Sequence, residues 1–260
     1  MAAKFSSKLT GKHVLVIGGT KGIGRGVVEG SIEAGARVTI SGSSQKSVDV
    51  TLSEVKAEYP DAPVTGVPCD LSKETVEQDL EALFTEVEKQ QPIDHVVLTA
   101  ADVLPVMKVE DFSYDKIRKG SHMRFILPIL LGKITKRHVA ASVNNSLTIS
   151  TGGIAEKPNA GWSVAAYMGA GLTGLARNLA LDLAPLRVNA VEPGFVDTPL
   201  WEVMGLDAAA REREFTKWGK LLPTGKVGQV VDVAEAYLYL MRDQNATGEI
   251  VKTRGGHNLI

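Results

Sequence analysis

The sequence of 260 residues predicts an α/β fold, a doubly wound parallel sheet of about seven strands with helices on both faces. Three observations support this prediction. Short apolar runs alternate with helical periodicities along the whole chain, and no linker, repeat or low-complexity tract interrupts them. The first apolar run leads through a glycine-rich turn directly into a helix. We therefore expect a single domain, residues 1–260, in which a polar helical insert at about 199–220 covers the substrate.

The composition excludes several classes of function. With 44% hydrophobic and 23% charged residues, the chain can bury one sizeable core. A net charge of −1 does not provide the concentrated basic surface that nucleic acids and anionic membranes require. The start of the chain has no secretory signal, and the longest apolar run, residues 125–131, is too short to span a bilayer. Cys69 is the only cysteine, which excludes an internal disulfide. We expect a soluble cytoplasmic protein that binds neither nucleic acid nor membrane.

The first elements form a strand, a glycine turn and a helix. Residues 14–17 are a short apolar run typical of a buried parallel strand, and a helical periodicity runs from Ile23 to Ile32. Glycines let the backbone approach a pyrophosphate closely, and a helix N-terminus offers free N–H groups and a positive dipole end. A tight turn that binds nothing is the alternative, but the flanking strand and helix favour nucleotide binding. The expected cofactor contacts here are Gly18, Thr20, Lys21, Gly22, Ile23 and Gly24.

The later elements continue the alternation. Apolar runs predict strands at residues 36–40, 63–68, 94–98, 146–150, 186–191 and 249–253. Helical patterns predict helices to about residue 59, at 73–91, at about 112–138, to about 183, within the insert, and at 230–241. The 112–138 stretch is interrupted by Gly120 and Pro128. Because ligands of such sheets bind at the carboxyl ends of the strands, the strand-end segments should meet at one crevice.

The end of the second predicted strand distinguishes between the two nicotinamide dinucleotides. A carboxylate there would bind the ribose hydroxyls and repel a 2′-phosphate. The chain instead has Ser41, Ser43 and Ser44, and Lys21 can reach the same phosphate as a point charge. A helix cap would explain the serines but not the missing carboxylate, so we predict NADP(H) as the cofactor. Asp70, after the third strand, suits an adenine amino group and is compatible with a cap on the following helix.

Several further motifs occur in order along the chain. They include Cys69-Asp70-Leu71, Arg187-Val188-Asn189-Ala190-Val191-Glu192-Pro193-Gly194, Val196-Asp197-Thr198-Pro199 and Gly255-Gly256. With the glycine turn, they resemble the short-chain dehydrogenase/reductase superfamily over nearly the whole chain. The resemblance implies a Rossmann sheet, NAD(P)H with its carboxamide near Val196 and Thr198, and a homodimer or homotetramer joined through helices at about 112–138 and 161–183. It also implies cofactor contacts at Leu71, Thr99, Ala100, Ala101, Pro193 and Gly194.

The usual catalytic pair of that superfamily is incomplete. Its members normally use a serine after the fifth strand and Tyr-x-x-x-Lys, in which lysine lowers the tyrosine pKa so that tyrosine can protonate an alkoxide. A gap-free alignment puts Ala165 and Gly169 in the tyrosine and lysine slots. A two-residue insertion would restore Tyr167 but would put Gly171 where lysine belongs. Lysine is therefore absent under both alignments.

These departures favour a different reaction. Carbonyl reduction needs an acid for the developing alkoxide, whereas hydride addition to an iminium carbon gives a neutral amine without such a proton. A cationic substrate would favour a nearby carboxylate, and Asp102 is a candidate; a cap on a solvated loop is an equal alternative for it. Ser150 and Thr151 keep hydroxyl groups near the usual serine slot.

Three segments resemble one branch of the superfamily. Thr99-Ala100-Ala101-Asp102, Arg124-Phe125 and Pro158-Asn159-Ala160-Gly161-Trp162-Ser163 are similar to the bifunctional reductase/Diels–Alderases of fungal prenylated indole alkaloid biosynthesis. This resemblance implies that Arg124 holds a substrate oxygen and that Trp162 packs against a bulky aromatic or heterocyclic substrate. The branch has an acidic residue where this chain has Asn159, which hydrogen-bonds but does not titrate. A subunit-interface role is the alternative for Arg124 and Trp162.

Three functions remain open from the sequence. The first is NADPH-dependent reduction of an iminium, imine or activated C=C bond in secondary metabolism, with or without a coupled cyclisation. The second is conventional carbonyl reduction in which Tyr167 acts with Ser150 or Thr151. The third is a redox-silent cyclase, isomerase or regulatory protein that keeps NADP(H) as a structural ligand. The sequence predicts no metal site.

Overall fold

The computed structural model describes residues 5 and 7–260. The strands are β1 (His13–Ile17), β2 (Arg37–Gly42), β3 (Val64–Pro68), β4 (His95–Leu98), β5 (Ser146–Ser150), β6 (Arg187–Pro193) and β7 (Ile250–Thr253). The helices are α1 (Gly22–Glu33), α2 (Gln45–Glu58), α3 (Val76–Glu88), α4 (Tyr114–Ser121), α5 (Leu127–His138), α6 (Ser163–Asp182), α7 (Leu200–Val203), α8 (Ala208–Leu221) and α9 (Val230–Arg242).

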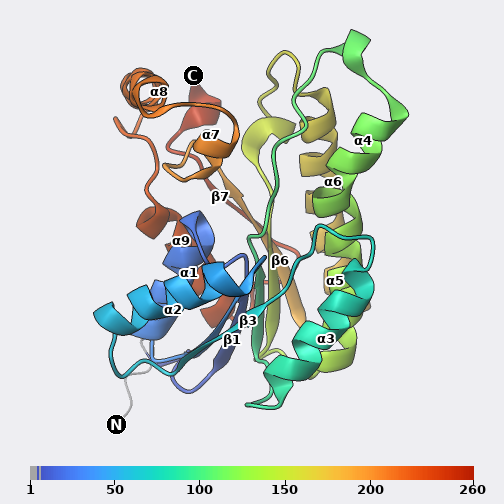
Figure 1. The fold of residues 1–260 in the computed structure, drawn as a ribbon, viewed down its shortest axis with the longest axis vertical. Coiled ribbons are helices and arrows are strands. Elements are labelled where there is room, and N and C mark those ends of the chain that lie inside the picture. The colour runs from blue at the N-terminus through green and yellow to red at the C-terminus, as the bar shows by residue number, and fades with distance from the viewer. Residues whose placement is uncertain (1–4, 6) are drawn as a thin grey trace.

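The strands form one parallel sheet of seven, in the order β3-β2-β1-β4-β5-β6-β7. Helices α1, α2 and α9 cover one face and α3, α5 and α6 cover the other (Figure 1). Every residue of β1 and β4 is buried, as expected for central strands covered on both faces. The strand order reverses between β1 and β4, which is where such sheets bind ligands. The predicted doubly wound parallel sheet is confirmed.

Helix α9 packs closely on α1 because two glycines of α1 face it. A Cβ atom on Gly26 would lie 2.4 Å from Cγ1 of Val230, and one on Gly30 would lie 2.8 Å from Cδ1 of Leu238. Larger side chains at either position would push the two helices apart. The close approach lets α9, including the fully buried Tyr237, complete the core on this face of the sheet.

The predicted helix at about 112–138 is divided into three parts. Helix α4 ends at Ser121, a π-helical turn covers His122–Ile126, and α5 begins at Leu127. Pro128 lacks the N–H group that a regular α-helix would direct to the carbonyl of Arg124, so the wider turn replaces the α pattern there. The interruption at Pro128 was predicted, but the π-helical geometry was not.

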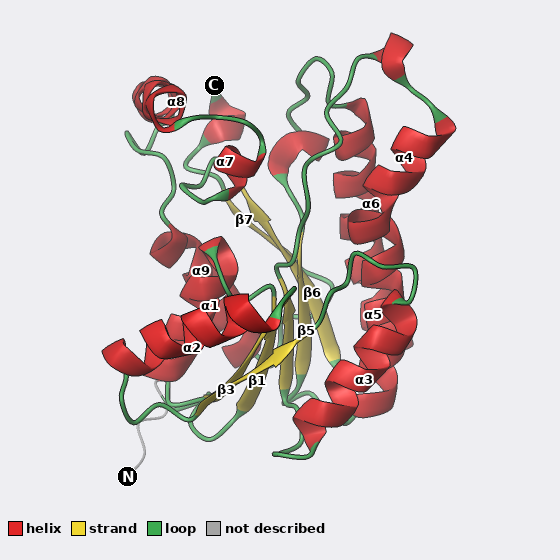
Figure 2. Ribbon diagram, viewed as in Figure 1, coloured by secondary structure: helices red, strands yellow, loops and turns green. Residues whose placement is uncertain are grey.

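The predicted insert consists of two helices rather than one. Helices α7 and α8 are separated by a turn at Gly205, whose φ of +90° favours glycine. Both lie beyond the end of β7, near the C-terminus (Figure 2). Arg211 on α8 pairs with Asp197 and with Glu202, which ties the insert to the segment that follows β6. Among the described residues, no helix is both long and apolar enough to cross a membrane.

Candidate active site

A cleft of about 1140 Å³ lies at the carboxyl ends of the strands. Its walls come from the turn after β1, the ends of β2, β4, β5 and β6, the π-helical turn, and the loop before α6. The predicted cofactor residues that line it are Gly18, Thr20, Lys21, Gly22, Ile23, Gly24, Ser41, Ser43, Asp70, Leu71, Thr99, Ala100, Ala101, Pro193, Gly194, Val196 and Thr198. The predicted catalytic residues that line it are Asp102, Arg124, Ser150, Thr151, Asn159 and Trp162. Ser44 and Tyr167 are not among the lining residues.

The glycine turn is packed as closely as its backbone allows. A Cβ atom on Gly18 would lie 2.3 Å from the Ala100 nitrogen, and one on Gly24 would lie 2.2 Å from the Gly18 oxygen. Thr99 Oγ1 donates to the carbonyls of Ile17 and Gly18, which fixes the turn to the end of β4. Lys21 is the N-cap of α1 and makes no side-chain cap, so the N–H groups of the first turn remain available to an anion. This backbone cradle fits a dinucleotide pyrophosphate.

The serines after β2 have separate roles. Ser44 caps α2, where its hydroxyl accepts from the Ser47 N–H at 3.2 Å, so its predicted contact with a 2′-phosphate is replaced by the capping role. Ser43 is exposed in the cleft. Ser41 is buried, and its hydroxyl has no hydrogen-bond partner among the described residues. A buried hydroxyl without a partner at the cleft wall suits a ligand that supplies one.

Asp70 both caps a turn and lines the cleft. Its Oδ1 accepts from the N–H and the hydroxyl of Ser72, at 3.1 and 2.7 Å. These hydrogen bonds lower the pKa of the Asp70 carboxyl, and Lys73 adds to the effect. Asp70 thus caps the turn at Ser72 rather than α3, whose N-cap is Thr75, and its contact with an adenine amino group stays a prediction.

The hydroxyls at the end of β5 donate to backbone carbonyls. Ser150 Oγ donates to the Leu98 carbonyl at 2.7 Å and accepts from the hydroxyl of Tyr237 at 2.6 Å. Burial raises the pKa of Tyr237, so this phenol stays protonated. Thr151 Oγ1 donates to the Gly169 carbonyl at 2.9 Å. Neither β5 hydroxyl therefore has an O–H group left to donate to a substrate oxygen.

Helix α6 presents small side chains to the cleft. Ala165, Gly169 and Leu172, spaced as on one helical face, line it. Tyr167 lies on another face and is 72% exposed. Two of these positions, Ala165 and Gly169, are the ones that the gap-free alignment assigns to the tyrosine and lysine slots.

Arg124 and Asp102, nominated separately from the sequence, form an ion pair inside the cleft. The Arg124 side chain is 12% exposed, and its guanidinium also donates to the carbonyls of Asp102, at 2.5 Å, and Val103, at 3.3 Å. The Asp102 carboxylate is half-exposed and uses one oxygen in this pair. Ser121, at the end of α4, donates its hydroxyl to the Arg118 carbonyl and is not a lining residue. Arg124 lies in the π-helical turn that follows it.

The loop between β5 and α6 brings Asn159 and Trp162 to the cleft. Asn159 is exposed and Trp162 is half-buried. The backbone N–H of Trp162 donates to the backbone carbonyl of Asn159 at 3.2 Å. The Met107 N–H donates to the Gly161 carbonyl at 2.9 Å, which ties this loop to the one after β4. The loop therefore places an amide and an indole on the same cleft as the Arg124–Asp102 pair.

A group of aromatic residues at the cleft was missed from the sequence. Phe195, Trp201 and His257 line the cleft on the side of the insert. The Phe195 and Trp201 rings stack at 5.3 Å and 3°, and the Trp201 indole N–H donates to the Val196 carbonyl at 2.8 Å. The signal in the sequence was slight: a tryptophan in a polar insert and a histidine after Gly255-Gly256.

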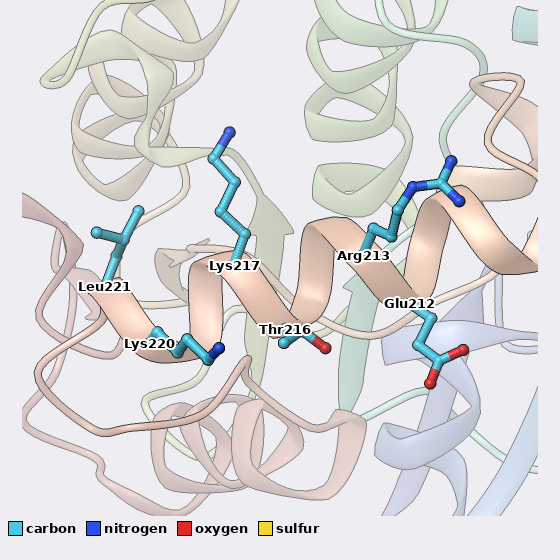
Figure 3. A pocket seen from close by; sticks show the side chains of 6 residues that line it. All are labelled: Glu212, Arg213, Thr216, Lys217, Lys220 and Leu221. Carbon is cyan, nitrogen blue, oxygen red and sulfur yellow. The ribbon is translucent and has the colours of Figure 1, made fainter.

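A second hollow, of about 670 Å³, lies along α8 (Figure 3). Its lining comes from that helix alone: Glu212, Arg213, Thr216, Lys217, Lys220 and Leu221. Because it gathers no group from another element, we assign it no role. In the described part of the chain, no three His, Cys, Asp or Glu side chains are grouped so that they could hold a metal ion.

Comparison with known proteins agrees with this geometry. A family model described as an SDR-like Rossmann domain matches residues 5–260. The short-chain dehydrogenase/reductase fsr5 of Gibberella fujikuroi is 41% identical over 264 residues, which cover 97% of both chains. The short-chain dehydrogenase/reductase malC of Malbranchea aurantiaca is 37% identical over 260 residues, which cover 95% of both chains.

Two solved structures extend the comparison. The MalC reductase/Diels–Alderase from Malbranchea aurantiaca superposes with a TM-score of 0.92 and 36% identity, covering 99% of this chain and all of that one. A small-chain dehydrogenase in complex with NADPH superposes with a TM-score of 0.75 and 25% identity, covering 96% of this chain and all of that one. The similarity therefore extends over nearly the full length in both sequence and structure.

Proposed function

Since this chain belongs to the short-chain dehydrogenase/reductase family, we propose that it is an NADP(H)-dependent reductase of secondary metabolism whose substrate is an iminium, an imine or an activated double bond. One observation supports the choice of reaction: at the cleft, both β5 hydroxyls donate to carbonyls, and α6 contributes Ala165 and Gly169, which the gap-free alignment assigns to the tyrosine and lysine slots. A carbonyl substrate would lack a proton donor at these positions. A cationic C=N⁺ group needs none.

Different residues of the cleft would bind the cofactor, stabilise the substrate's charge, orient the substrate and exclude water. NADPH, when bound, supplies a hydride. The glycine turn and Ser41 would hold its phosphates and ribose, and the Asp102 carboxylate would stabilise a positive charge on the substrate. Arg124 would orient a substrate oxygen through its remaining N–H donors, while it holds Asp102 in place. Trp162 would exclude water from one side of the substrate. The similarity to MalC, a reductase/Diels–Alderase, supports a coupled cyclisation as part of this proposal.

The proposal includes the assembly and location of the protein. Apolar side chains remain exposed on the π-helical turn and on α5 and α6, among them Phe125, Ile129, Tyr167 and Leu181. Exposed apolar groups at these two helices fit a homodimer or homotetramer that buries them. The single, buried Cys69 fits a reducing compartment, and we propose the cytoplasm.

A matched pair of substrates tests the reaction. With NADPH and enzyme, N-methyl-3,4-dihydroisoquinolinium should be reduced, and 1-tetralone, a neutral bicyclic ketone of similar size, should not. Stopped-flow absorbance of NADPH measures both reactions. Reduction of the ketone at a similar rate would contradict the proposal in favour of conventional carbonyl reduction. Absence of any NADPH oxidation with either compound would favour a redox-silent protein.

Tyr167→Phe is the internal control for that experiment. Because Tyr167 projects away from the cleft, the variant should retain turnover within a few-fold of the parent enzyme. A loss of about 100-fold, the usual contribution of a general acid, would mean that Tyr167 reaches the substrate after all.

NADPH should bind at least about tenfold more tightly than NADH, which corresponds to about 1.4 kcal/mol. The physical reason is that Lys21 and the Ser43 hydroxyl meet the 2′-phosphate, and that the residues lining the cleft after β2 include no carboxylate. Ser43→Asp should reverse the preference, because the new carboxylate repels the phosphate and binds the ribose hydroxyls. Isothermal titration calorimetry with both cofactors measures this. Equal affinities for the parent protein would contradict it.

A further inference from the structure

His257 is a buried imidazole whose ring nitrogens have no hydrogen-bond partner in the described part of the chain. It begins the short helix His257–Leu259 after β7, is 6% exposed, and lines the cleft. The other histidines each have at least one bonded ring nitrogen: His13, His95, His122 and His138. The ring nitrogens of His257 are not among the fully enclosed polar atoms that lack a partner, so they remain accessible, and the residue lines the cleft. Imidazole nitrogens that are accessible and unused by the protein can hydrogen-bond a ligand in the cleft.

The backbone holds this ring in one place. Gly255 and Gly256 have φ values of +60° and +82°, and a Cβ atom on Gly256 would lie 2.6 Å from Cγ of Pro223. The turn that presents His257 therefore requires glycine. The Lys157 ammonium, from the loop that carries Trp162, donates to the His257 carbonyl at 2.8 Å. Two walls of the cleft thus meet at this residue.

Aromatic rings and two cations surround the His257 ring. The Phe195 and Trp218 rings meet the His257 ring edge-on, with centroids 5.6 and 5.3 Å away. Burial lowers the pKa of the imidazole, and the charges of Lys157 and Arg254 lower it further. A neutral imidazole has one N–H donor and one acceptor nitrogen. The site therefore combines aromatic surfaces with a single hydrogen-bonding edge.

We propose that His257 is a substrate-binding residue whose imidazole hydrogen-bonds a hydroxyl or N–H group on the rim of a planar ring system packed beside the stacked Phe195 and Trp201 rings. This inference rests on the proposed function in one respect: it assumes that the substrate binds on the side of the cleft formed by Phe195, Trp201 and His257. It narrows the substrate class to flat aromatic or heteroaromatic compounds that carry a hydrogen-bond donor on the ring edge.

The experiment uses two planar probes, 2-naphthol and 2-methoxynaphthalene, which differ in the donor hydroxyl. Each is titrated by calorimetry into the protein saturated with NADP⁺, which permits no reduction. The parent protein should prefer 2-naphthol. His257→Phe keeps a ring against Phe195 and Trp218, and should weaken 2-naphthol binding about tenfold while changing 2-methoxynaphthalene binding less than about twofold. His257→Asn, which keeps a donor and an acceptor, should recover part of the loss.

Asn258→Ala is the matched control. Asn258 lies on the same short helix, bonds Glu156 at 3.1 Å and does not line the cleft, so this variant should bind both probes as the parent does. An equal loss of both probes in His257→Phe, the same loss in Asn258→Ala, or no binding of 2-naphthol to the parent would each overturn the proposal. Because the readout is binding, a failure to reduce the isoquinolinium substrate would overturn the proposed reaction without affecting this result.

Discussion

Arg124→Ala should lower turnover of an iminium substrate by about 100-fold while leaving NADPH affinity unchanged. The guanidinium holds the Asp102 carboxylate in the cleft and also donates to the Asp102 carbonyl. Its loss leaves that carboxylate without a fixed position, and a small misplacement at a reacting centre costs a factor of this order. Trp162→Ala should also lower turnover, because it removes the indole that encloses the substrate. Steady-state turnover and NADPH titration measure the two effects separately.

Arg137→Ala provides the control for Arg124→Ala. Arg137 lies on α5 and pairs with Glu81 at the surface, outside the lining of the cleft. Its replacement should leave turnover at the parent level. If Arg124→Ala and Trp162→Ala instead unfold, or dissociate the oligomer with normal activity per subunit, then these are interface residues and the assignment to the active site is wrong.

Arg187→Met should produce the largest loss of stability, about 4–5 kcal/mol or failure to accumulate as folded protein. The Arg187 side chain is 2% exposed. Its guanidinium donates to five backbone carbonyls, those of Val143, Leu240, Met241, Asp243 and Ala246. Methionine can fill much of the volume but cannot donate, so the Val143 carbonyl before β5 and four carbonyls in or just after the last turn of α9 lose their partner together.

Urea unfolding of Arg187→Met and of Arg213→Met tests this expectation. Arg213 is exposed on α8, so its replacement should change the free energy of unfolding by less than about 0.5 kcal/mol. Arg187→Lys keeps a cation with fewer donors, so its loss in the free energy of unfolding should lie between those of Arg187→Met and Arg213→Met. A loss below about 1 kcal/mol in Arg187→Met would show that water or rearranged backbone satisfies the carbonyls.

The centre of the sheet was predictable because β1 and β4 are apolar runs after their first histidine, and a parallel sheet buries such runs on both faces. Helix boundaries were less predictable. The 73–91 helix begins only at Val76, since Asp70 and Ser72 first form a capped turn. The π-helical turn depends on a single missing N–H at Pro128, which marks an interruption but does not specify its geometry.

The cofactor side of the site was predictable for the same topological reason: residues that follow parallel strands meet at one edge. The pairing of side chains within the site was not predictable from the sequence. Arg124 and Asp102 are separated by twenty-two positions, and only the fold brings them together. Ser44 could serve either a phosphate or α2, and the start of the helix decided between them. His257 and Phe195 come from distant segments, so their contact leaves no local pattern in the sequence.

The close packing of α1 against α9 has a consequence for synthesis of the protein on the ribosome. The glycine turn belongs to the first strand and helix, yet the face of α1 that carries Gly26 and Gly30 is covered by a helix that begins at Val230. A nascent chain that has reached only the middle of the sequence can pair its first strands but leaves this face open to solvent. The first strand and helix are therefore among the first parts to be translated, but this face of α1 is covered only once residues 230–242 have been made.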